Sequence, residues 1–187
     1  IGGDRDGNPN VTSKTTKEVI LLSRWEAASL YEKEFTKLIQ SLSLHDCSKK
    51  IKKIVGITRE PYRVFLRPIR NKLKETKREI EISLKENRIP KKSLLVQSIN
   101  EIIEPLTDVY NSLCFVKCDI IANGIVLDLI KRAYTFGLNL AKLDIRQESA
   151  RHSKLINSVC KKLGLDEYEK LSEKEKILFL TKEYKSK

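Results

Sequence analysis

The chain has 187 residues, of which 40% are hydrophobic, a length and a composition that suit one globular domain with a buried core. The sequence contains no apolar run long enough for a membrane span and no signal-peptide pattern, so we expect no membrane contact, no secretion and a cytoplasmic location. The formal net charge is +12, and the segment 49–92 supplies +11 of it, through sixteen lysines and arginines against five glutamates.

The first part of the chain predicts two helices after a glycine-rich opening. Thr15–Glu18 has the form of a capping box, and apolar residues then recur at threes and fours, which predicts a long amphipathic helix. Asp46 or Ser48 can cap a short second helix that Gly56 ends.

Two further helices are predicted in the middle of the chain. One starts at Pro61, and it either kinks at Pro68 or begins its regular part there, because proline lacks the backbone donor. The proline and lysines of 87–93 indicate a loop. A second capping box at Ser98–Glu101 then opens another helix.

The last part of the chain mixes helices with one strand. Asn123–Gly124 is a turn signal, and a helix is predicted over 125–136. The short, alternating segment 138–146 predicts a strand that presents its polar end at the C-terminal edge. Helices are predicted again from about 150 to 163 and from a third capping box at 172–175.

These elements predict a mainly α fold with one strand, and a second strand fits at the N-terminal edge. A helix-rich layer around one or two strands of a barrel that lies mainly outside this chain would have this pattern. The sequence begins at Ile1 within a glycine-rich turn and contains no methionine, so we expect it to be cut from a longer protein.

The four cysteines lack the spacing of a disulfide framework or of a zinc site. They stand at positions 47, 114, 118 and 160, with only two histidines as further ligands and no CxxC pair. We expect each cysteine to be reduced and buried, without a metal.

Residues 1–12 pack charged side chains and glycines into one turn. In one interpretation the turn is rigid, and Asp4 and Asp6 pair with Arg5 or cap the following helix. In the other it binds an anion or a phosphate, because the glycines permit close backbone approach and Arg5 supplies a bidentate donor. Calcium is not expected, since Pro9 stands where a calcium loop requires glycine.

The segment 143–152 (LDIRQESARH) gathers polar side chains at the end of the predicted strand. At a barrel strand this is where substrate groups are held, and Arg146 can grip a phosphate through two parallel hydrogen bonds. Glu148 or Asp144 could orient its guanidinium. The alternative is a structural salt-bridge cluster that joins strand to helix. The candidate residues are Asp144, Arg146, Gln147, Glu148, Arg151 and His152.

The basic stretch 49–92 also has two interpretations. Its charges alternate with apolar residues at helical spacing, as on a solvated helix surface. The alternative is a helical module that binds a nucleic-acid backbone, although Tyr62 and Phe65 are too few for a stacking platform.

Several motifs together resemble phosphoenolpyruvate carboxylase, and the bacterial type most closely. GGDRDGNPNVT precedes a long helix with LLSRW, followed by EPYR, IIANG and finally LDIRQES-RH, in the family's order and at compatible spacing. GGDRDGNP and LDIRQES-RH are the specific motifs, and the likeness covers nearly the whole chain. Pro68 departs from what the family's helix leads us to expect there.

The resemblance implies an allosteric lyase that fixes carbon dioxide by converting phosphoenolpyruvate and bicarbonate into oxaloacetate and phosphate. The reaction is anaplerotic, because oxaloacetate feeds the tricarboxylic acid cycle. The resemblance implies an α/β barrel of the TIM type, to which this mainly α segment contributes one or two strands. It also implies Mg²⁺ or Mn²⁺ as cofactor, a homotetramer, and no nucleic-acid or membrane partner. Arg146 would face the phosphate of phosphoenolpyruvate or of the carboxyphosphate intermediate, with the other polar residues of 143–152 in support. Arg5, beside Asp4 and Asp6, would contact an anion or a sugar-phosphate activator.

The family's TAHPT motif, with the catalytic histidine, and its GYSDS-K motif, near the metal-binding carboxylates, do not occur in the sequence. We therefore expect residues 1–187 to be one interior segment of a carboxylase that extends on both sides. Neither His45 nor His152 is assigned as general base. The segment by itself should be inactive and should depend on the remainder of the parent chain as its partner.

Overall fold

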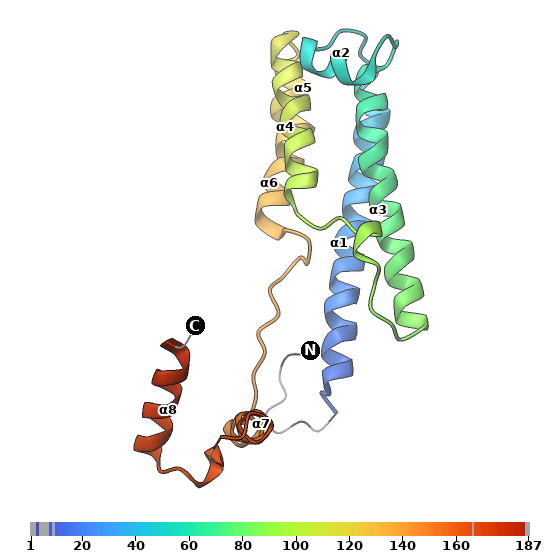
Figure 1. The fold of residues 1–187 in the computed structure, drawn as a ribbon. Helices are drawn as coiled ribbons and strands as arrows, with labels where there is room; N and C mark the ends of the chain where they lie inside the picture. The colour runs from blue at the N-terminus through green and yellow to red at the C-terminus, as the bar shows by residue number, and fades with distance from the viewer. Residues whose placement is uncertain (1–2, 4–7, 9, 166, 186–187) are drawn as a thin grey trace. The chain divides into compact units, whose positions relative to one another are not determined.

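The computed structural model describes residues 3, 8, 10–165 and 167–185. It divides into two units: residues 17–143, and residues 1–16 together with 144–187. The described residues are mainly helical and form no extended strand (Figure 1). None of their helices combines the length and the apolarity that crossing a bilayer requires.

In the larger unit two long helices, α1 (Ser13–Ser41) and α3 (Pro61–Lys85), run antiparallel (Figure 1). Trp25 Nε1 on α1 donates to Glu81 Oε1 on α3 over 2.8 Å, and Lys77 Nζ lies 3.0 Å from Glu32 Oε2. Trp25 precedes Glu32 on α1, whereas its partner Glu81 follows Lys77 on α3, so the two helices run in opposite directions.

The short helix α2 (Lys49–Val55) connects the two long helices. Ser48 caps it, because its hydroxyl accepts the amide of Ile51, and Gly56 ends it with a φ of 73°. The prediction for this helix is confirmed, and Ser48 rather than Asp46 is the cap.

Helices α4 (Asn100–Phe115) and α6 (Leu127–Phe136) complete the larger unit, with the 3₁₀ turn η1 (Lys92–Leu94) in the loop before α4. The capping box before α4 is confirmed: the amide of Ser98 donates to Glu101 Oε1 over 3.1 Å. Gly137 ends α6 with a φ of 57°.

Two local predictions are corrected, and one open alternative is decided. The first capping box is predicted too late in the chain, since α1 begins at Ser13 and the Thr12 hydroxyl accepts the amide of Thr15. The helix predicted from Pro61 is confirmed, and its regular part does not begin at Pro68, because α3 runs through that residue. The predicted turn at Asn123–Gly124 is part of a helical path through α5 (Asp119–Ile121) and the π-helical turn η2 (Ala122–Val126), in which only Gly124 leaves helical dihedral angles.

One apolar core holds the larger unit together. Removing a large apolar side chain from water contributes about 1.5–3 kcal/mol. Two of its buried hydroxyls are paired: Tyr62 Oη lies 2.8 Å from Ser112 Oγ, which also accepts the amide of Ser48. Its largest fully buried side chains are Phe35, Leu42, Ile51, Tyr62, Leu66, Leu73, Ile102, Leu106, Val109, Leu113 and Val126.

The strand predicted over 138–146 is wrong for the described residues. The one inter-segment backbone hydrogen bond found in this segment is at its end, where the Arg146 amide donates to the Gly3 carbonyl over 2.9 Å. Leu140 has a φ of 59°, which is outside the strand region, and the Asn139 carbonyl accepts the Ser23 hydroxyl. A strand needs a continuous ladder of backbone partners, and the described residues provide one rung.

The smaller unit contains α7 (Ser149–Lys162), the 3₁₀ turn η3 (Tyr168–Lys170) and α8 (Glu173–Lys185). Both predicted helices are confirmed, as is the third capping box, in which the Ser172 amide donates to Glu175 Oε2 over 2.7 Å. Tyr168 contacts Phe179 with ring centroids 5.8 Å apart, which joins η3 to α8.

The four cysteines are free thiols, as predicted. Only Cys160 is buried, and the other three are half-buried, so the expectation of full burial is wrong for Cys47, Cys114 and Cys118.

Candidate functional site

Arg146 and Asp144 form the one charged pair found in the described part of the LDIRQESARH segment. Arg146 Nε donates to Asp144 Oδ2 over 3.2 Å, and the two side chains are 71% and 79% exposed. The Nη groups of Arg146 have no hydrogen-bond partner among the described residues. A guanidinium in this state keeps four N–H donors for an anion.

The backbone of Arg146 is joined to the N-terminal motif. Its amide donates to the Gly3 carbonyl over 2.9 Å, so the two segments with the most specific motifs of the sequence meet at this hydrogen bond. Asp4, Arg5 and Asp6 lie outside the described residues, and their roles in an anion or activator site remain predictions.

The other candidates surround the start of α7. Gln147 Oε1 accepts the amide of Glu148 over 3.2 Å, and the Glu148 carbonyl accepts the amide of Arg151 over 3.1 Å. The side chains of Glu148, Arg151 and His152 are exposed, and none forms an ion pair with another described residue. Arg146 is thus paired with Asp144 rather than with Glu148. The salt-bridge cluster that was the structural alternative for this segment is not formed among the described residues.

Metal-binding chemistry is not found in the described residues. They contain no group of three or more His, Cys, Asp or Glu side chains close enough to hold an ion. A divalent metal would require at least some ligands from other residues.

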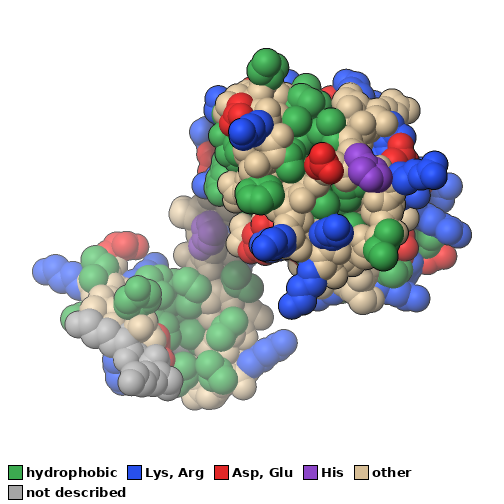
Figure 2. Space-filling view, turned by 90° about the horizontal axis from the view of Figure 1, so that it is seen from above, with side chains coloured by type: hydrophobic (Ala, Val, Ile, Leu, Met, Phe, Trp, Pro, Cys, Tyr) green, Lys and Arg blue, Asp and Glu red, His purple; other side chains and the backbone are tan. Residues whose placement is uncertain are grey.

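The larger unit also has a hollow of about 610 Å³ that the sequence did not predict. It lies where the loops around α2 meet, and Figure 2, which looks onto this end, shows lysine and arginine side chains around hydrophobic ones. Of the quoted motifs only EPYR reaches it, through Pro61, and that motif did not indicate a hollow. None of the predicted site residues lines it; its walls are formed by His45, Asp46, Cys47, Lys52, Gly56, Ile57, Thr58, Arg59 and Pro61.

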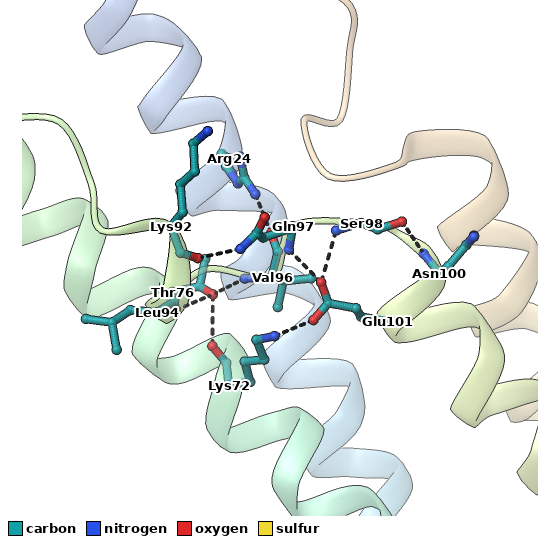
Figure 3. A network of polar contacts seen from close by, with 10 residues as sticks. All are labelled: Arg24, Lys72, Thr76, Lys92, Leu94, Val96, Gln97, Ser98, Asn100 and Glu101. Carbon is teal, nitrogen blue, oxygen red and sulfur yellow. Dashed lines mark hydrogen bonds and ion pairs between the residues drawn. The ribbon is translucent and has the colours of Figure 1, made fainter.

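A polar network also joins residues far apart in sequence (Figure 3). The buried Thr76 hydroxyl accepts the Val96 amide over 2.9 Å, and Arg24 Nη2 donates to the Val96 carbonyl. Glu101 pairs with Lys72 and accepts the amides of Gln97 and Ser98. The network attaches the loop before α4 to both long helices and is structural.

The same network shifts two pKa values. Burial lowers the pKa of the Arg24 guanidinium, and the charge of Glu101 opposes this change. Burial alone would raise the pKa of Glu101, but the hydrogen bonds from Lys72 and from two amides outweigh it and lower that pKa.

The basic stretch 49–92 is partly neutralised by ion pairs within the described residues. Six of its sixteen cations contact carboxylates, and Lys72 and Lys77 do so across helices. These contacts favour the helix-surface interpretation. Nucleic-acid binding by this stretch stays an untested alternative.

Comparison with known proteins identifies the family. The sequence matches the profile of phosphoenolpyruvate carboxylase over residues 1–187. Phosphoenolpyruvate carboxylase of Hahella chejuensis (strain KCTC 2396) is 44% identical over 183 residues, which are 98% of this chain and 21% of that protein. The carboxylase of Klebsiella pneumoniae (strain 342) is 41% identical over 189 residues, which cover 100% of this chain and 21% of that protein. The chain therefore spans about a fifth of the length of these relatives, and it belongs to the phosphoenolpyruvate carboxylase family.

Proposed function

We propose that this chain is an interior segment of a phosphoenolpyruvate carboxylase that extends on both sides of it. The parent enzyme would join phosphoenolpyruvate and bicarbonate to give oxaloacetate and inorganic phosphate. The observation that carries the proposal is the family match over all 187 residues, together with an exposed arginine in the LDIRQES motif whose Nη groups have no described partner.

In this proposal Arg146 faces the phosphoryl group of phosphoenolpyruvate or of carboxyphosphate. A bicarbonate oxygen bonds to phosphorus as the bond between phosphorus and the enol oxygen breaks, which gives carboxyphosphate and leaves the electron pair on the enolate oxygen. A fixed cation stabilises the negative charge on the oxygens of the phosphoryl group during this transfer. An arginine suits this task because its charge persists at any working pH and its planar fork contacts two oxygens at once.

The neighbouring polar residues would complete the substrate site. Gln147, Glu148, Arg151 and His152 lie at the start of α7, within six residues of Arg146. Arg5, with Asp4 and Asp6, would contact an anion or an activator, and Gly3, which directly precedes them in sequence, accepts a hydrogen bond from the Arg146 amide. The Mg²⁺ or Mn²⁺ of the parent enzyme would be held mainly by residues elsewhere in it.

The test replaces Arg146 in the whole carboxylase and measures kcat/KM for phosphoenolpyruvate. Loss of one preorganised donor group typically lowers turnover by about 10²–10³-fold, so we expect a fall of this order in Arg146→Ala. Arg146→Lys should recover only part of the activity, since lysine keeps the charge and loses the fork. Near-normal kcat/KM in both variants would assign Arg146 to structure instead.

A further inference from the structure

The pairing of Asp144 with Arg146 uses only one edge of the guanidinium. Asp144 Oδ2 accepts from Nε over 3.2 Å, whereas Nη1 and Nη2 have no hydrogen-bond partner among the described residues. Both side chains are mostly exposed, so packing does little to hold the arginine rotamer. The carboxylate of Asp144 is therefore the main described constraint on the direction of the fork.

A guanidinium can present two different edges to an anion. One edge consists of Nε with the neighbouring Nη, and the other consists of the two Nη groups at its outer end. When a carboxylate occupies Nε, the outer end remains for two oxygens of a phosphoryl group. The hydrogen bond from the Arg146 amide to the Gly3 carbonyl fixes the backbone from which this side chain extends.

We propose that Asp144 is a positioning residue that makes the outer, Nη end of Arg146 the phosphate-binding edge. The inference rests on the proposed function, since it concerns the same phosphate site. It specifies which edge of the Arg146 guanidinium binds the phosphate, and it names Asp144 as the residue that selects this edge.

Loss of Asp144 should change the affinity for phosphate in the direction opposite to that expected from charge alone. A carboxylate beside a phosphate site repels the phosphate, so removal of its charge alone should tighten anion binding. If Asp144 positions the fork, its removal lets the guanidinium rotate among several rotamers, and anion binding weakens although the site becomes more positive.

The experiment compares Asp144→Ala and Asp144→Asn in the whole carboxylase, with inorganic phosphate as the probe. In Asp144→Ala we expect kcat/KM for phosphoenolpyruvate to fall about tenfold and the inhibition constant of inorganic phosphate to rise about tenfold. In Asp144→Asn the amide oxygen can still accept from Nε, so both changes should shrink to about two- to threefold. An inhibition constant does not depend on the fraction of enzyme that is active, so a merely structural defect would leave it unchanged.

Glu167→Gln is the matched control. Glu167 is an acidic residue of the same unit that pairs with Lys170 over 3.0 Å, away from the LDIRQES segment, and its replacement removes the same charge. Both kinetic values should stay at the wild-type level in this variant.

The outcomes separate the two proposals. If Arg146→Lys lowers kcat/KM while Asp144→Ala binds phosphate as tightly as wild type or more tightly, the positioning role of Asp144 is refuted and the role of Arg146 stands. If Arg146→Lys changes neither kcat/KM nor the inhibition constant of phosphate, the proposed function of Arg146 fails, and the positioning role fails with it.

Discussion

The pKa of the Glu79 carboxylate is lowered by the hydrogen bonds that it accepts from three neighbouring residues. Its side chain is 4% exposed, and it accepts hydrogen bonds from both Nη groups of Arg88, from the Lys91 amide over 2.7 Å and from the Ser83 hydroxyl. The hydrogen bonds from Arg88, followed by that from Lys91, lower the pKa of Glu79 to about 2. Through Arg88 and Lys91, this carboxylate fixes the conformation of the loop that follows α3.

The lowered pKa of Glu79 predicts a defined pH dependence of folding. The carboxylate stabilises the fold fully above its ordinary pKa of 4.5, and this contribution is lost as the pH falls towards the folded value of about 2. We expect the free energy of unfolding of the purified protein, measured by urea denaturation, to decrease across this pH window. Glu79→Gln should remove that part of the decrease, whereas Glu75→Gln on the exposed face of α3 should retain it. An unchanged pH profile in Glu79→Gln would show that this carboxylate does not titrate as described.

At the scale of elements, side chains at and between helices fix the loops. Ser48, Glu101 and Glu175 each satisfy backbone amides at the start of a helix. The loop before α4 differs, because Thr76, in the interior of α3, receives the Val96 amide and contacts the Leu94 carbonyl. One buried hydroxyl thus connects the loop to the helix that it crosses (Figure 3).

Thr76→Val should destabilise the larger unit. Thr76 is 1% exposed, and the substitution leaves the buried Val96 amide without an acceptor, which costs about 1–3 kcal/mol. Urea denaturation should show this loss, and hydrogen exchange at the Val96 amide should become faster. Thr76→Ser keeps the hydroxyl and should retain slow exchange at that amide. Equal exchange rates in wild type and Thr76→Val would contradict the assigned hydrogen bond.

At the scale of the whole molecule, the described residues expose apolar side chains on both helices of the smaller unit. Leu155 on α7 is 63% exposed, Leu163 directly after α7 is 69% exposed, and Leu178 on α8 is 69% exposed. The chain spans about a fifth of the length of its relatives. Contact with further parts of the parent enzyme would cover such faces.

We expect the purified 187-residue chain to produce no oxaloacetate from phosphoenolpyruvate and bicarbonate. Its described residues contain no cluster of metal ligands, and its sequence lacks the family's TAHPT and GYSDS-K motifs. A coupled assay with malate dehydrogenase measures the product, and the whole carboxylase in the same assay is the positive control. Bicarbonate-dependent oxaloacetate formation by the chain alone would refute this prediction.

Much of the helical structure could be predicted from the sequence, because helix periodicity and capping depend on residues three or four positions apart. Ser48, Gly56, Gly137 and the box at Ser172 are such local signals, and the structure confirms them. The two corrected helix predictions also concern local features. The Thr12 hydroxyl accepts an amide at the start of α1, and Gly124 leaves helical dihedral angles without ending the helical path.

The sequence by itself determined the family, the helical class and the arginine of greatest interest, since motifs and periodicity are properties of contiguous residues. Only the tertiary structure decided that 138–146 forms a single backbone contact rather than a strand, and that Thr76 secures a loop twenty residues away. The physical reason is that a strand and a buried hydrogen bond between distant residues each require a partner, and the spatial position of that partner follows from the packing of the whole chain.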